Sequence, residues 1–226
     1  MRDMVFCCDP NHPYAEICGT VLSPQVVLSE CNTTFFGVRF LPGYNPVLGS
    51  ADIMAHLVNH RIPLDDLIQD RRMLEGIWGA SDFRQQIRVF MRSYMNIYRR
   101  VCPQEHQNLL VLHSSNLMIR SGGGISVEQL AEDTGYTPRY IDKCFRNETG
   151  LSPKQLAKIV RFQTAVSALN QNQHTGRSLT EIAADLGYFD QSHFVHDFKT
   201  YTGLTPKKYQ MLLRNDAFDE KLRIVQ

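Results

Sequence analysis

The sequence lacks long hydrophobic runs and contains no lysine before Lys143. No segment of about 18 consecutive apolar residues occurs, so we expect no membrane-spanning helix and no membrane partner. The opening residues, MRDMVFCCDPNHP, contain no apolar core of the length typical of a signal peptide. These two absences predict a cytoplasmic protein.

Motifs of common enzyme classes are also missing. The chain has no phosphate-binding loop, no nucleophile elbow and no glycine-rich dinucleotide motif. His56 and His60 have the spacing of zinc ligands on a helix, but Leu57 and Val58 follow His56 where a zinc hydrolase needs glutamate. We therefore expect no enzymatic activity, no catalytic residues and no cofactor.

Paired C-x-x-C motifs are absent as well, although the chain has six cysteines. Zinc-binding residue types gather near the start, at Cys7, Cys8, His12, Cys18 and Cys31. Without a secretion signal these cysteines are expected to be free thiols, and no metal site is predicted. A metal- or thiol-responsive regulator and an alkyl-transfer protein of DNA repair that uses an N-terminal cysteine remain as alternatives.

The most informative feature present is a phrase that occurs twice near the C-terminus. The first copy runs from Ser126 to Lys154 and the second from Ser178 to Lys207, with an offset of 52 residues that becomes 53 after one insertion. Two copies of one helical unit suggest two equivalent contacts with a repetitive partner such as DNA. The formal net charge is only +1, so affinity for DNA must come from a few cations placed on one face.

Each copy has the pattern of a helix-turn-helix. Ser126 with Gln129, and Ser178 with Glu181, predict capping boxes at the start of a helix. Gly135 or Gly187 then predicts a sharp reversal of the chain before a second helix, which normally enters the major groove of DNA. After each copy, a Ser-Pro or Thr-Pro pair predicts the start of another helix; the first of these is expected to run from Pro153 to about Leu169 and join the copies.

The second helix of each copy is amphipathic. Ile141 and Phe145, and in the second copy Phe194 and Phe198, are expected to face a core. The outward side chains are of types that bind bases or phosphates. The candidate DNA-binding residues are Arg139, Tyr140, Asp142, Lys143 and Arg146 in the first copy, and Gln191, Ser192, His193, His196 and Lys199 in the second.

These residues resemble the DNA-binding domain of the AraC/XylS family of bacterial transcription regulators. The resemblance covers about residues 124–213 and is carried by both phrases, above all by GYFDQSHFVHDFKTYTGLTPKKY in the second copy. It implies an all-α seven-helix domain with two helix-turn-helix motifs that binds promoter DNA, usually as an activator. RNA polymerase, a small-molecule effector and a second copy of the chain are the further partners that such a regulator implies.

The N-terminal part predicts a small α+β regulatory or dimerisation domain over residues 1–120. Strands are expected within about 1–48, including VVLSEC and TFFGVRF, and helices within about 63–118. GVRFLPG followed by PLDDL resembles the end of the β-barrel part of one regulator subgroup, but too few residues precede the helices for a complete barrel, so a partial β-barrel-like sheet is expected. The run SGGG suggests a linker before the DNA-binding domain at 121–214, and a polar tail follows at 215–226.

Overall fold

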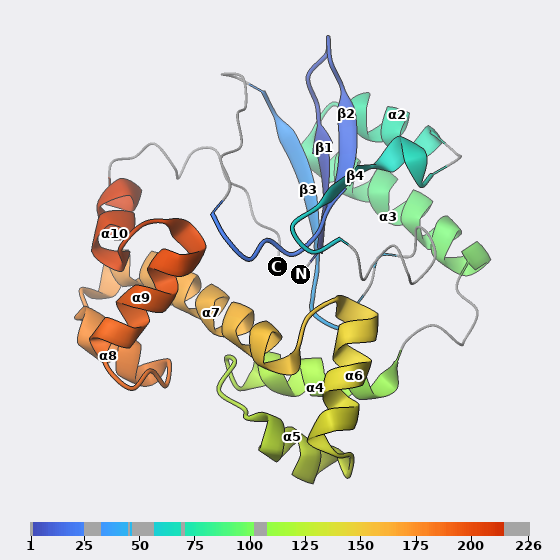
Figure 1. The fold of residues 1–226 in the computed structure, drawn as a ribbon. Helices are drawn as coiled ribbons and strands as arrows, with labels where there is room; N and C mark the ends of the chain where they lie inside the picture. The colour runs from blue at the N-terminus through green and yellow to red at the C-terminus, as the bar shows by residue number, and fades with distance from the viewer. Residues whose placement is uncertain are drawn as a thin grey trace. The chain divides into compact units, whose positions relative to one another are not determined.

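The computed structural model describes residues 2–24, 33–44, 46, 57–68, 71–101 and 108–214 (Figure 1). The strands are β1 (Arg2–Cys7), β2 (Tyr14–Cys18), β3 (Phe35–Phe40) and β4 (Arg61–Pro63), followed by a 3₁₀ turn, η1 (Leu64–Asp66). The helices are α2 (Arg72–Trp78), α3 (Phe83–Val101), α4 (Leu109–Arg120), α5 (Val127–Thr134), α6 (Pro138–Thr149), α7 (Pro153–Thr175), α8 (Leu179–Asp185), α9 (Gln191–Thr202) and α10 (Pro206–Arg214). No helix within the described ranges has both the length and the apolar character that a membrane span requires. The predicted order, an α+β part followed by an all-α part, is confirmed.

The chain divides into two compact units. One comprises Met1–Leu22, Val26–Asn116 and Ala131–Pro153, and the other comprises Ser23–Gln25, Leu117–Leu130 and Lys154–Gln226. The sheet and α6 therefore belong to the first unit, whereas α8, α9 and α10 belong to the second.

The sheet of the first unit is antiparallel, with the strand order β3-β1-β2-β4. Side chains alternate between the two faces of a strand, and one face of this sheet is apolar. Met4, Ile17 and Phe36 of that face are buried in one core with Leu74 of α2 and Phe90 of α3. The two helices thus cover one face of the four-stranded sheet, and a partial sheet with helices is what the sequence predicted.

The opposite face of the sheet carries charged pairs. Arg39 on β3 donates two hydrogen bonds to the carboxylate of Asp3 on β1, at 2.9 and 2.7 Å. Arg61 on β4 donates to Glu16 on β2 at 2.8 Å. Because both arginine side chains are exposed to solvent, each pair contributes about 0–1 kcal/mol, and the apolar face supplies most of the stability.

The predicted elements of the first unit are mostly present. TFFGVRF contains β3, while the predicted strand VVLSEC lies outside the described residues. The predicted helical region begins with two pieces, η1 and α2, on either side of Arg71. At the start of α3, the Asp82 side chain acts as the cap, because its Oδ1 accepts from the Gln85 amide at 2.7 Å.

The run SGGG forms a packed turn between α4 and α5. Gly122 and Gly123 have φ angles of 59° and 81°, a left-handed backbone that glycine adopts without a Cβ penalty. The Gly123 amide donates to the Met118 carbonyl at 2.8 Å, and a Cβ on Gly123 would lie 2.3 Å from the carbonyl oxygen of Ala157 on α7. The run is therefore an ordered turn, and the domain boundary expected there stays a prediction. Glycine is needed here because the backbone of α7 approaches closely.

Candidate nucleic-acid interface

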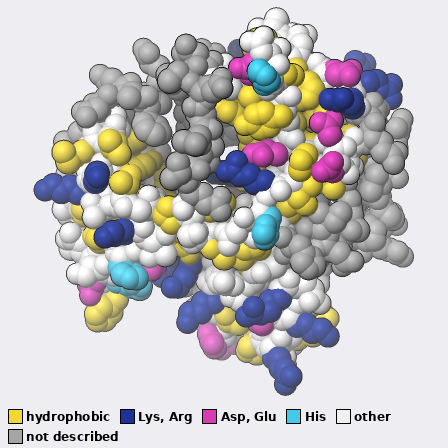
Figure 2. Space-filling view, turned by 45° about the horizontal axis from the view of Figure 1, so that its top comes forward, with side chains coloured by type: hydrophobic (Ala, Val, Ile, Leu, Met, Phe, Trp, Pro, Cys, Tyr) yellow, Lys and Arg dark blue, Asp and Glu magenta, His cyan; other side chains and the backbone are white. Residues whose placement is uncertain are grey.

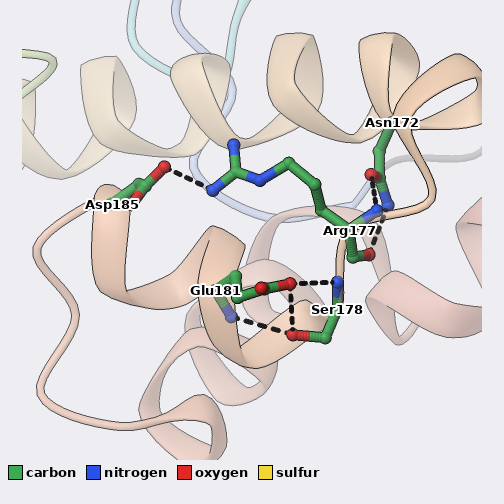
Figure 3. A network of polar contacts seen from close by, with 5 residues as sticks. All are labelled: Asn172, Arg177, Ser178, Glu181 and Asp185. Carbon is green, nitrogen blue, oxygen red and sulfur yellow. Dashed lines mark hydrogen bonds and ion pairs between the residues drawn. The ribbon is translucent and has the colours of Figure 1, made fainter.

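The second copy begins with a network of polar contacts between the end of α7 and α8 (Figure 3). The Asn172 side chain pairs with the backbone of Arg177 through hydrogen bonds of 2.9 and 2.7 Å, and the Arg177 guanidinium pairs with Asp185. Ser178 and Glu181 form the predicted capping box: the Ser178 amide donates to the Glu181 carboxylate at 2.7 Å, and the Glu181 amide donates to Ser178 Oγ at 3.2 Å. The backbone hydrogen bond from Ser178 holds the pKa of Glu181 below its usual value. These contacts fix the entry of the chain into α8.

The turn between α8 and α9 follows the prediction. Gly187 adopts a φ of 70° and reverses the chain after α8. α9 begins at Gln191, and its N-cap is Asp190, whose Oδ1 accepts from the His193 amide at 2.7 Å. The cap satisfies a free amide and fixes the first turn of α9, which presents its side chains to solvent.

The inner face of α9 is held by aromatic packing. Phe194 and Phe198 are fully buried, as predicted from their spacing. The rings of Phe194 and Tyr188 lie 5.2 Å apart, and Phe198 lies 5.5 Å from Phe162 on α7 and 5.4 Å from Tyr209 on α10. Burial raises the pKa of Tyr188 to about 12, so its phenol stays neutral in this core. The packing fixes which face of α9 points outward.

The first copy starts in the same way. The Ser126 amide donates to Gln129 Oε1 at 2.8 Å, and the Gln129 amide donates back to Ser126 Oγ at 3.2 Å. Gly135 has a φ of 73°, as the predicted reversal requires. α6 then begins after Thr137, whose Oγ1 accepts from the Tyr140 amide at 3.3 Å. Both predicted capping boxes and both glycine turns are therefore confirmed.

The ends of α6 and α9 are also equivalent. Thr149 Oγ1 donates to the Phe145 carbonyl at 2.7 Å and accepts from the Leu151 amide at 3.1 Å. Thr202, 53 residues later, donates to the Phe198 carbonyl at 2.8 Å and accepts from the Leu204 amide at 3.0 Å. A left-handed glycine follows each threonine and ends the helix. The two candidate recognition helices therefore begin and end with equivalent backbone conformations.

The outward face of α6 is rich in charge. Arg139, Lys143 and Arg146 are exposed, and Asp142 is half-buried. Arg146 Nε donates to the Asp142 carboxylate at 2.7 Å, so this acid is partly neutralised within its own helix. The ring of Tyr140 stacks on that of Tyr136, with centroids 5.1 Å apart. Figure 2 shows Lys and Arg side chains, in dark blue, gathered at the bottom of the view, where α5 and α6 lie.

The outward face of α9 is nearly neutral. Its five predicted side chains are all exposed: Gln191, Ser192, His193, His196 and Lys199. The Thr180 hydroxyl of α8 donates to Gln191 Oε1 at 2.8 Å. His193 Nε2 lies 3.8 Å from the carboxylate of buried Asp197, one turn further along α9. Each helix thus brings its own five predicted residues onto one accessible face.

Two residues that the sequence reasoning missed belong to the same surface on α6. An open depression of about 530 Å³ is lined by the five predicted residues of the first copy together with Thr137 and Asn147. Asn147 follows Lys143 by four residues, and that spacing places both on the same helical face. The signal for Asn147 was therefore present in the sequence.

The N-terminal cysteines do not have the character of reactive thiols. Cys7 is buried, and burial raises the pKa of the Cys8 thiol. Burial raises the pKa of Cys18 to about 12. Because a thiolate is the nucleophile, Cys8 and Cys18 are poor alkyl acceptors near neutral pH, and Cys7 is inaccessible because it is buried. Among the described residues no group of three potential ligands could hold a metal ion, and Cys31 lies outside those residues.

Comparisons with known proteins place the helical part among transcription regulators. Residues 104–211 match the family model described as a helix-turn-helix domain. The chain is 27% identical over 103 residues to the HTH-type transcriptional activator AarP of Providencia stuartii, which covers 46% of this chain and 71% of that protein. It is 34% identical over 84 residues to an uncharacterized HTH-type transcriptional regulator of Haemophilus influenzae, which covers 37% of this chain and 27% of that protein. These similarities agree with the expectation of a regulator rather than an enzyme.

A solved structure extends the likeness to the fold of nearly the whole chain. ToxT from Vibrio cholerae matches with a TM-score of 0.53 at 13% identity, covering 93% of this chain and 90% of that chain. The likeness supports the fold alone. The chain spans only 11% to 35% of the length of four other curated regulators that it matches, so similarity to them concerns the helical part.

Proposed function

We propose that this chain, whose residues 104–211 match a helix-turn-helix family model, is a sequence-specific transcription regulator of the AraC/XylS type that binds promoter DNA. The observation that carries the proposal is that α6 and α9 have equivalent backbone conformations and expose equivalent faces. Two helices that are capped, buried and ended by glycine at equivalent positions present ten accessible polar or aromatic side chains. Helices of this kind insert into the major groove in other helix-turn-helix proteins.

Affinity and specificity have different sources in this proposal. Lys143, Arg146 and Lys199 contribute mainly by contacts with phosphates, which fix the position of the protein but carry no sequence information. Arg139 and Gln191 read base edges, because their side chains can make directed hydrogen bonds in the major groove. Asp142 repels phosphate, and its pairing with Arg146 reduces that repulsion and suits a role in selecting bases.

The proposal includes the reading of two adjacent major grooves by one chain. α7 follows the first copy, precedes the second and is continuous over 23 residues. A helix of that size is about 34 Å long, close to the repeat of the major groove along DNA. A continuous helix between the copies supports this arrangement. Within it, residues 121–214 are the DNA-binding domain and residues 1–120 the regulatory domain.

Activation through RNA polymerase is the proposed outcome of binding. The name of AarP describes an activator, and that relative matches the helical part of this chain. A small-molecule effector or a second copy of the chain would act through the N-terminal domain, and the protein would work in the cytoplasm, where promoters are accessible.

Selection of genomic fragments by the purified chain tests the proposal. Arg139→Ala should relax the base preference at one position of the bound motif and cost about 1–3 kcal/mol of binding free energy. Arg88→Ala is the matched control, because Arg88 is an equally exposed arginine on α3. Recovery of no fragment at low salt, or an unchanged motif for the Arg139 variant, would count against the proposed function.

A further inference from the structure

The contact between Thr180 and Gln191 bears on which base the second copy reads. Thr180 is the second residue of α8 and Gln191 the first of α9, and both side chains are exposed. The Thr180 hydroxyl donates to Gln191 Oε1 at 2.8 Å. The start of α8 is already capped by Ser178 and Glu181, so the helix does not need the Thr180 hydroxyl for its own ends.

The hydrogen bond orients the Gln191 amide. A glutamine side chain has an acceptor at one prong and two donor hydrogens at the other. Because Thr180 occupies one of the two lone pairs of Oε1, both hydrogens of Nε2 remain available to DNA but only one lone pair of Oε1 does. An exposed glutamine without such a partner is able to turn either prong outward.

Base edges differ in what they require of a glutamine. Adenine offers a donor at N6 and an acceptor at N7, so its recognition uses both prongs of the amide at once. Guanine offers acceptors at N7 and O6, and thymine offers an acceptor at O4. An amide whose oxygen is partly engaged by Thr180 offers its donors more readily than its acceptor, which suits guanine or thymine better than adenine.

We propose that Thr180 is a positioning residue that biases Gln191 toward the acceptor edges of guanine or thymine. The proposal rests on the proposed function, because it assumes that α9 enters the major groove. The first copy has no such device, since Glu128 and Pro138 occupy the positions equivalent to Thr180 and Gln191. The bias is thus expected for the second recognition helix alone.

The experiment is a selection of bound sequences from a random DNA pool by the full chain and two variants of Thr180. Thr180→Val removes the hydroxyl while nearly keeping the shape, and Thr180→Ser keeps the hydroxyl. The wild-type chain and Thr180→Ser should prefer guanine or thymine at the position read by Gln191. Thr180→Val should raise the relative recovery of adenine there at least about fivefold, the lower range for one bidentate base pair contact. Binding of unrelated DNA should stay within about twofold, because phosphate contacts are unchanged.

Gln191→Ala identifies the position, because its base preference should disappear in this variant. A wild-type preference for adenine at that position would overturn the proposal, and so would an identical preference in Thr180→Val. An unchanged motif in Gln191→Ala would overturn it too, since Gln191 would then read no base. Failure of the wild-type chain to select any sequence would instead contradict the proposed function. A purely structural role for Thr180 would lower binding to all sequences equally and leave the preferred base unchanged.

Discussion

The two helix-turn-helix copies have equivalent backbone conformations but different outward side chains. At equivalent positions of their second helices, the outward side chains are Lys143 in the first copy and His196 in the second, and the inward ones are Cys144 and Asp197. Glycines, caps and buried rings are repeated because each satisfies a local demand of the fold. The outward residues face no such demand, so their difference points to separate roles in binding.

The surroundings of the copies differ as well. Tyr188 of the second copy is only 7% exposed and packs on Phe194, whereas its counterpart Tyr136 is 49% exposed and stacks on Tyr140. The C-terminus of α6 is contacted by Arg2 of β1, while α9 is packed by aromatic rings of α7 and α10. In the second copy, α9 thus packs against the neighbouring helices α7 and α10. In the first copy, α6 contacts strand β1 of the sheet.

Truncation of a buried aromatic ring should lower the free energy of unfolding more than any other change considered. Phe145→Ala and Phe198→Ala each remove a fully buried ring and should lower the free energy of unfolding by about 3–5 kcal/mol. The loss should be greater for Phe198, because its ring contacts Phe162, Phe194 and Tyr209. Urea denaturation followed by circular dichroism measures the midpoints.

A matched control exists in the second copy. Phe189 is the residue inserted before Asp190 and is 93% exposed, so Phe189→Ala should change the free energy of unfolding by less than about 0.5 kcal/mol. A loss in this variant as large as that of Phe198→Ala would contradict the assigned inward face of α9.

The turns and helix caps of the two copies could be predicted from the sequence, because they depend on residues that are close together in the chain. A left-handed turn favours glycine, and a capping box needs serine three residues before glutamate or glutamine, so Gly187 and Ser178 were identified without a structure. The same spacing rules identified the buried rings and therefore, by exclusion, the outward faces of α6 and α9.

Long-range contacts could not be predicted in this way. The close approach of Gly123 to α7 involves Ala157, and nothing near the glycine run indicates it. The bond between Thr180 and Gln191 joins two helices across a turn, so helical periodicity does not reveal it. The sequence therefore indicated which residues face outward but not how their side chains are oriented.

Salt dependence should separate the two outward faces. Each phosphate contact made by a cation contributes about −0.9 to the slope of log affinity against log salt concentration. Lys143→Ala should reduce the magnitude of this slope by about 0.9. His196 occupies the equivalent position without the permanent charge of a lysine, so His196→Ala should change the slope by less than Lys143→Ala does.

Fluorescence anisotropy with a selected DNA fragment, repeated from about 50 to 200 mM salt, measures these slopes. Equal changes of the slope in the two variants would show that both copies contribute equally to phosphate binding. The two copies would then differ only in the bases that they recognise.

Removal of the contact between the sheet and α6 should change the free energy of unfolding only slightly. Arg2 is only 7% exposed, and its Nη2 donates to the Glu148 carbonyl at 3.2 Å. Burial lowers the pKa of Arg2 to about 10, an effect larger than the opposing attraction of Glu148. Because the folded-state pKa lies below the value in the unfolded chain, the burial penalty is fully present at neutral pH and disappears only as the pH rises through both values.

Arg2→Met should therefore change the free energy of unfolding by less than about 1 kcal/mol, because an apolar side chain of similar length removes the penalty together with the hydrogen bond. Arg39→Met is the control, since Arg39 forms an exposed pair worth about 0–1 kcal/mol. Urea midpoints at an unchanged slope measure both variants. A loss of about 3 kcal/mol or more in Arg2→Met would mean that the buried contact is a strong stabilising pair. The first copy would then depend on the sheet for its stability, in contrast to the second, whose aromatic packing comes from α7 and α10.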